Sequence, residues 1–125
     1  MQTRDQKLAA TIYTHVSELT PKSSDAKQYG AMAHKLPILI HTAGLAQALT
    51  FVEARGVGKQ KLLLKHLAII LGDTTAEKLL QRCYRAELGE YQMLTMRAVA
   101  ALQWYKRFAQ SILEVEAGEE STTEG

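Results

Sequence analysis

Apolar residues recur at intervals of three and four along most of this chain, and this spacing constrains the fold more than any other feature. The last run, from Tyr91 to Ile112, keeps the spacing over about six turns and predicts a long helix with one buried face. No run alternates polar and apolar residues over the length of a strand. We therefore expect an all-α fold, a compact bundle of five to six helices with a long C-terminal helix.

Capping residues and prolines divide the first half of the chain. Thr3 and Gln6 have capping-box spacing, which predicts a first helix from Thr3 to about Leu19. A second helix is expected to begin near Ser24 and Asp25, whose side chains can cap free amides. Because a proline disfavours helical geometry at the residue before it, Pro37 predicts that this helix ends near Lys35 and that a third begins at the proline.

Glycines and a second capping pair divide the rest. The sequence Gly56-Val57-Gly58 is expected to stop the third helix, and a short apolar helix covers residues 59–71. Thr74 and Glu77 again have capping-box spacing and open a helix that is expected to pause at Gly89. The apolar stripes expected on these helices include Ile38, Tyr84 and Leu88.

The length of 125 residues suits one domain with a single core, which we place at residues 1–117. Residues 118–125 form an acidic tail without a hydrophobic residue and are expected to be disordered. The single cysteine, Cys83, excludes an internal disulfide framework, and the first twenty residues contain no apolar block of signal-peptide length. The expected location is the cytoplasm, with no membrane association.

Charge is distributed unevenly along the chain. All 15 basic residues precede position 108, and five of the 13 acidic residues lie in the last twelve. Residues 1–113 therefore carry 15 basic against 8 acidic residues. A basic body with a short acidic tail is a charge distribution found in proteins that bind polyanions.

The common catalytic and metal-binding patterns are missing. Gly58 and the lysine after it suggest a phosphate loop, but Glu53 and Gln60 occupy the positions where that motif needs glycine and a magnesium-binding hydroxyl. His34 and His41 lack the spacing of paired metal ligands on a helix. We expect no enzyme activity, no cofactor and no metal site. A small helical hydrolase is a further hypothesis, but no motif in the sequence supports it.

Basic residues alternate with large aromatic residues near the end of the last predicted helix. Arg97, Trp104 and Arg107 fall roughly on one face, with Lys106 beside them. They could bind phosphates, with Trp104 as a platform for a base or a partner, or the tryptophan could simply pack at the edge of the core. Other basic residues that could follow a phosphate backbone, or face solvent, are Lys61, Lys65, Arg82 and Arg85.

Short motifs in a fixed order carry a family resemblance over residues 3–113. They are Gln6-Lys7-Ala9 with Tyr13, then Leu36-Pro37 leading to Ile40, Gly44-Leu45 and Gln47-Ala48-Leu49, and finally Trp104-Tyr105-Lys106-Arg107-Phe108. Together they resemble the small-subunit family of the type III-B CRISPR (Cmr) effector complex.

The resemblance implies a non-catalytic, all-α subunit that stacks in more than one copy along an RNA-guided complex and helps to hold the guide and target RNA. The implied partners are the other Cmr subunits, copies of this chain, and the two RNAs. Lys7, Trp104, Lys106 and Arg107 lie in matching segments, and the three cations are the expected phosphate contacts. Gly44 is expected to allow close helix packing.

A helical protein-interaction module without direct RNA binding is the alternative hypothesis. In that case Trp104, Tyr91 or the pair Met93 and Met96 would form an exposed apolar patch. The two hypotheses differ in whether removing charge abolishes RNA retention while assembly stays intact.

Overall fold

The computed structural model describes residues 1–118 and confirms the all-α fold. Within those residues there is no strand. Six helices follow one another along this part of the chain: α1 (Arg4–Ser17), α2 (Ser24–Ala43), α3 (Leu45–Arg55), α4 (Gln60–Ile70), α5 (Ala76–Arg85) and α6 (Leu88–Ser111). The expected disorder of the acidic tail concerns residues 119–125, which lie outside the described residues.

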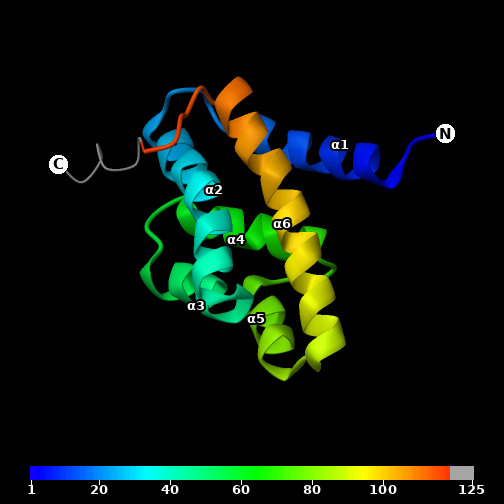
Figure 1. Ribbon diagram of the computed structural model, residues 1–125. Helices are drawn as coiled ribbons and strands as arrows, with labels where there is room; N and C mark the ends of the chain where they lie inside the picture. The colour runs from blue at the N-terminus through cyan, green and yellow to red at the C-terminus, as the bar shows by residue number, and fades with distance from the viewer. Residues whose placement is uncertain (119–125) are drawn as a thin grey trace.

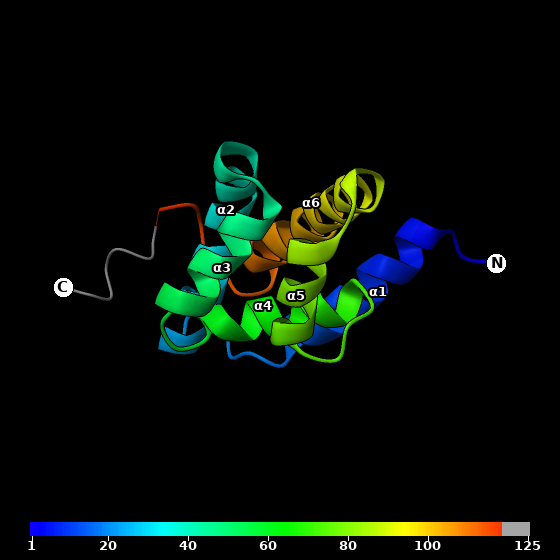
Figure 2. The same cartoon turned by 90° about the horizontal axis from the view of Figure 1, so that it is seen from below.

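The two longest helices, α2 and α6, pack against each other and run in opposite directions (Figure 1). Helices α3, α4 and α5 contact one another and pack as a second layer against this pair, as the view from below shows (Figure 2). Helix α1 packs against α6. Leucine, isoleucine, valine and alanine side chains from all six helices form one continuous core.

Three helix starts show how local sequence positions each element. At Thr3 both halves of the predicted capping box form, since the hydroxyl accepts from the Gln6 amide and the Gln6 side chain accepts from the Thr3 amide. The cap of α2 is Ser23 rather than the expected Ser24 or Asp25. The cap of α5 is Thr75 rather than Thr74, and its hydroxyl accepts from the Lys78 amide at 3.1 Å.

The predicted helix end near Lys35 is wrong, because α2 continues through Pro37 to Ala43. A proline inside a helix costs about 3 kcal/mol, but Leu36 and Ile40 are both buried on the same side of the helix. Each such burial contributes about 2 kcal/mol, which offsets the proline. The chain breaks instead at Gly44, whose φ of +90° suits glycine, so this residue links α2 to α3. A Cβ at Gly44 would lie 3.4 Å from the Tyr91 hydroxyl, so the glycine also lies close to α6.

The boundary between α5 and α6 also differs from the prediction. The helices are separated at Ala86 and Glu87, and Gly89 lies inside the first turn of α6 instead of interrupting a helix. Three apolar positions expected on buried stripes are exposed: Ile38 (66%), Tyr84 (57%) and Leu88 (70%). The stop at Gly56 and the buried face of α6 are as predicted.

After α6 the chain turns back across α2. Leu113 and Val115 are fully buried, and the Val115 carbonyl accepts a hydrogen bond of 2.9 Å from Nε2 of His34. Gly30 lies directly beneath this segment, because a Cβ there would be 2.8 Å from the Cβ of Val115. Leu113 and Val115 therefore belong to the core.

Candidate nucleic-acid interface

The joint between α1 and α6 brings together the first and last of the motifs found in the sequence. Nε1 of Trp104 donates to Oδ1 of Asp5 at 3.1 Å. One turn further along α6, the Phe108 ring meets the Tyr13 ring edge to face, with centroids 5.6 Å apart. Trp104 is half-buried, as expected for a residue at the edge of the core.

The three cations expected to contact phosphates have no side-chain partner among residues 1–118. Lys7 and Arg107 are exposed and Lys106 is half-buried, and none of these side chains has a hydrogen bond or ion pair within residues 1–118. They do not share one face. Successive residues of a helix are separated by about 100°, so Lys106 and Arg107 point in different directions, and Lys7 lies roughly opposite Asp5 and Tyr13 on α1.

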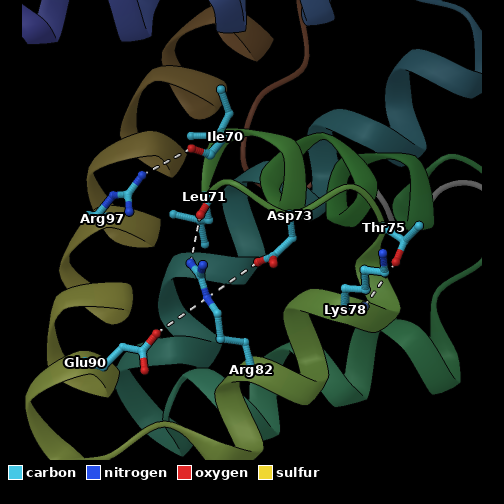
Figure 3. A network of polar contacts seen from close by, with 8 residues as sticks. All are labelled: Ile70, Leu71, Asp73, Thr75, Lys78, Arg82, Glu90 and Arg97. Atoms are coloured by element: carbon cyan, nitrogen blue, oxygen red, sulfur yellow. Dashed lines mark hydrogen bonds and ion pairs between the residues drawn. The ribbon is translucent and has the colours of Figure 1, made fainter.

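Arg82, by contrast, is held by the protein itself (Figure 3). Its Nη2 donates to the Leu71 carbonyl at 2.8 Å, and its Nε lies 3.6 Å from Oδ2 of Asp73 and 3.8 Å from Oε2 of Glu90. The guanidinium thereby joins the end of α4, the loop that follows it and the first turn of α6. A cation at a helix C-terminus also interacts favourably with the helix dipole.

The other predicted basic residues lie at the surface. Arg97 is exposed, and its Nη2 lies 3.4 Å from the Ile70 carbonyl, a long hydrogen bond at the edge of the same network (Figure 3). Lys61 and Lys65 are exposed on one side of α4, and Arg85 is exposed at the end of α5. Within residues 1–118 the side chains of these last three have no hydrogen bond or ion pair.

Sequence reasoning missed a polar cluster inside the core. His15 and His66 stack with ring centroids 4.0 Å apart, and Nδ1 of each is 2.7 Å from a buried hydroxyl, that of Tyr105 and Tyr29 respectively. Burial lowers the pKa of both imidazoles, that of His66 to about 4, so the stack is uncharged at neutral pH. Its members come from four helices, and no local spacing could have indicated it.

Potentially reactive groups outside this cluster are sparse in the described part of the chain. Cys83 is buried, and desolvation raises the pKa of its thiol to about 11, which favours the unreactive protonated form. Residues 1–118 contain no group of three or more metal-ligating side chains that could hold a metal ion. None of the helices formed by these residues is long and apolar enough to cross a membrane.

Comparisons with known proteins agree on one family. A family model described as CRISPR-associated protein (Cas_Cmr5) matches residues 4–112. The CRISPR system Cmr subunit Cmr5 of Thermus thermophilus is 42% identical over 114 residues, which cover 91% of this chain and 99% of that protein. The crystal structure of a CRISPR-associated Cmr5 family protein, also from Thermus thermophilus, is similar with a TM-score of 0.80 and 41% identity, covering 90% of this chain and 99% of that one.

Proposed function

Since this chain belongs to the Cmr5 family of CRISPR-associated proteins, we propose that it acts as a non-catalytic small subunit of a type III-B Cmr effector complex and contacts the RNA backbone there. The relative that supports this role is named a Cmr subunit and matches over nearly its whole length. The other Cmr subunits and further copies of this chain are the proposed partners, and guide and target RNA are the proposed ligands.

The observation that supports RNA contact is a set of cations without a side-chain partner in the described part of the chain. Arg82 and Arg97 are engaged by backbone carbonyls, and Arg82 also by carboxylates. The remaining predicted basic side chains have no such partner within residues 1–118: Lys7, Lys61, Lys65, Arg85, Lys106 and Arg107. Fixed positive charge of this kind binds phosphates without reading sequence, so guide pairing would supply the specificity.

The cations face several directions, which suits a subunit placed among neighbours better than a chain that binds RNA alone. A single module with a few phosphate contacts binds weakly at physiological salt, with a Kd on the order of 10⁻⁴ to 10⁻⁶ M. Within a complex, copies of the chain would place these charges side by side along the RNA. RNA retention therefore depends on assembly.

The structure also offers an observation that favours the alternative, a protein-interaction module without direct RNA binding. Met93 and Met96 are 50% and 72% exposed on α6. Tyr91, however, is half-buried, and its hydroxyl accepts from the Ala46 amide at 2.9 Å. Of Tyr91, Met93 and Met96, only the two methionines therefore form an exposed apolar surface, which is suited to contact with another protein.

Single-stranded RNA binding across a salt series tests the proposal, with Lys7, Lys106 and Arg107 changed together to alanine. A control that removes equal charge outside the candidate set changes Arg55, Lys59 and Lys78. Each lost phosphate contact reduces the slope of log K against log salt by roughly 0.7 for a single strand, so the first variant should lose a slope of about 2. The control should keep the wild-type slope.

The same variants are then assembled with the other Cmr subunits. Loss of RNA retention by the first variant, with assembly intact, supports RNA contact by this chain. Equal slopes for the two variants, together with unchanged RNA retention in the complex, would overturn it and leave the protein-interaction module.

A further inference from the structure

A groove between α1 and α6 has the chemistry of a nucleobase site. Three aromatic residues line it, Tyr13, Trp104 and Phe108, together with Gln2, Asp5, Gln6, Ala9 and Ala10. Tyr13 is 53% exposed although it contacts Phe108, and the other two rings are half-exposed. Aromatic surface is thus open to solvent at the joint where the first and last helices meet.

The rings are held in place before any ligand arrives. Trp104 and Phe108 lie 5.5 Å apart and inclined by 31°, and Tyr13 meets Phe108 at 80°. The hydrogen bond from Trp104 to Asp5 fixes the indole, since it ties the ring to a neighbouring helix. A preorganised aromatic surface loses little freedom on binding, and nucleobases of any sequence stack on such surfaces.

The polar groups of the groove suit a base better than a phosphate. Among residues 1–118 no basic side chain lines the groove, and the Asp5 carboxylate would repel an anion. Oδ1 of Asp5 accepts from Trp104, which leaves Oδ2 to accept from the N–H group of a base. Oε1 of Gln6 is taken by the Thr3 amide, which leaves the side-chain N–H groups as donors.

Arg107, which adjoins the groove residue Phe108 in the sequence, is a cation that could bind the adjoining phosphate. Arg107 is exposed, precedes Phe108 and follows Trp104 by one turn of α6. Its guanidinium has no hydrogen bond or ion pair within residues 1–118. Arg107 is thus available to the phosphate of a nucleotide whose base occupies the groove.

We propose that this α1–α6 groove binds one unstacked base of single-stranded RNA, and that Asp5 favours bases with an exocyclic amino group. The inference rests on the proposed RNA contact and adds to it a site for a base rather than the backbone. Adenine, guanine and cytosine carry the amino group, whereas uracil offers the carboxylate only its ring N3–H, which lies between two carbonyl oxygens that the carboxylate repels. Oligoadenylate therefore binds more tightly than oligouridylate of the same length.

Trp104 is the only tryptophan in the chain, so its fluorescence reports directly on the groove. The full-length protein is titrated with oligoadenylate and with abasic RNA of equal length, while binding is followed independently by fluorescence anisotropy of the labelled RNA. Oligoadenylate is expected to quench Trp104, whereas abasic RNA binds through its phosphates without quenching. Equal quenching by both RNAs would overturn the site.

Tyr13→Ala provides the mutational test, and Tyr84→Ala is its matched control because Tyr84 is 57% exposed on α5, a helix that does not line the groove. Tyr13→Ala should weaken binding of oligoadenylate about 5- to 100-fold and leave abasic RNA unaffected. Tyr84→Ala should change neither by more than about twofold. Equal losses in the two variants would contradict the proposal.

The outcomes separate this inference from the proposed function. If RNA binds with the salt dependence described above but neither quenches Trp104 nor depends on Tyr13, only the base site is wrong. If no RNA is retained by the chain or by its complex, the proposed RNA contact itself fails. If Trp104 emission changes when other subunits bind and never when RNA binds, the groove is a protein contact and the base site is again wrong.

Discussion

His15 and His66 stack face to face in the middle of the bundle, with ring centroids 4.0 Å apart. Each imidazole is hydrogen-bonded through Nδ1 to a buried tyrosine hydroxyl, so α1, α2, α4 and α6 all meet at this pair. His66 is buried and His15 half-buried, and two stacked imidazoles withdrawn from water in this way are stable only while they are uncharged. The core therefore contains a pair of groups whose protonation opposes folding.

We predict that the free energy of unfolding falls as the pH is lowered from about 6.5 to about 4. Burial lowers the pKa of His66 to about 4, and the positive charges of His15 and Lys65 add to this effect. Burial also lowers the pKa of His15, although Glu18 opposes the shift. In the unfolded state a histidine binds a proton near pH 6.5, whereas in the folded state it does so only at lower pH. As the pH falls below 6.5, protons therefore bind to the unfolded state before the folded state, and the free energy of unfolding decreases.

Urea unfolding across this pH range measures the effect, and His66 should account for about 3 kcal/mol of the loss. Carboxylates titrate in the same range, so the informative quantity is the difference between the wild type and His66→Gln. The exposed His41→Gln serves as the control and should keep the wild-type pH dependence. An identical pH dependence for His66→Gln and the wild type would show that the stack does not bind protons on unfolding.

Gly30→Ala should destabilise the protein because its Cβ would lie 2.8 Å from the Cβ of Val115. Overpacking of this kind costs about 1–3 kcal/mol, measurable by urea unfolding. Gly89→Ala is the matched control, since a Cβ at Gly89 meets nothing within 4 Å. That change should raise stability by roughly 0.5 kcal/mol, because alanine is the better helix former.

Val115→Ala distinguishes steric crowding from a general intolerance of α2 to substitution. In the Val115→Ala background, Gly30→Ala should cost less than it does alone, since the two methyl groups that a Cβ at Gly30 would meet at 2.9 and 3.1 Å are gone and only the Val115 Cβ position at 2.8 Å stays crowded. Additive costs of the two changes would contradict the packing explanation.

Local sequence rules predicted those features of the fold that depend on neighbours in sequence. The Thr3 capping box, the stop at Gly56 and the buried stripe of α6 each involve residues within a few positions of one another. Pro37 misled the prediction because the burial of Leu36 and Ile40 depends on packing by other helices.

In the candidate site, too, features set by nearby residues could be predicted from the sequence, and features set by the packing of distant helices could not. That lysines such as Lys7 and Lys65 are exposed follows from their charge and helix position. That Arg82 is held internally could not be read from the sequence, because its carboxylate partners lie in the loop after α4 and at the start of α6. The aromatic groove likewise depends on how α1 crosses α6.

Thr75→Ala should lower the free energy of unfolding by about 1 kcal/mol. The Thr75 hydroxyl caps α5 by accepting from the Lys78 amide, and alanine would leave that amide without its partner. Thr74→Ala is the control, because the Thr74 side chain is exposed and has no hydrogen bond within the part of the chain that the structure describes. A larger loss at Thr74 than at Thr75 would place the cap where the sequence alone suggested.

Arg82→Met should destabilise the protein by about 1–2 kcal/mol, a loss measurable by thermal or urea unfolding. Methionine keeps much of the side-chain volume but removes the donor to the Leu71 carbonyl and the charge facing Asp73, whose side chain is only 14% exposed. Arg85→Met, at an exposed position without an internal partner in residues 1–118, should change stability by less than about 0.5 kcal/mol.

A second substitution, at Asp73, tests whether the charge facing Arg82 accounts for this loss of stability. In the Arg82→Met background, Asp73→Asn should recover part of the lost stability, because a neutral amide tolerates that partly buried position better than a carboxylate without its cation. In the wild-type background the same change should destabilise, since Arg82 loses a partner of opposite charge. A destabilisation of equal size in both backgrounds would mean that Arg82 acts on Leu71 alone and that Asp73 contributes independently.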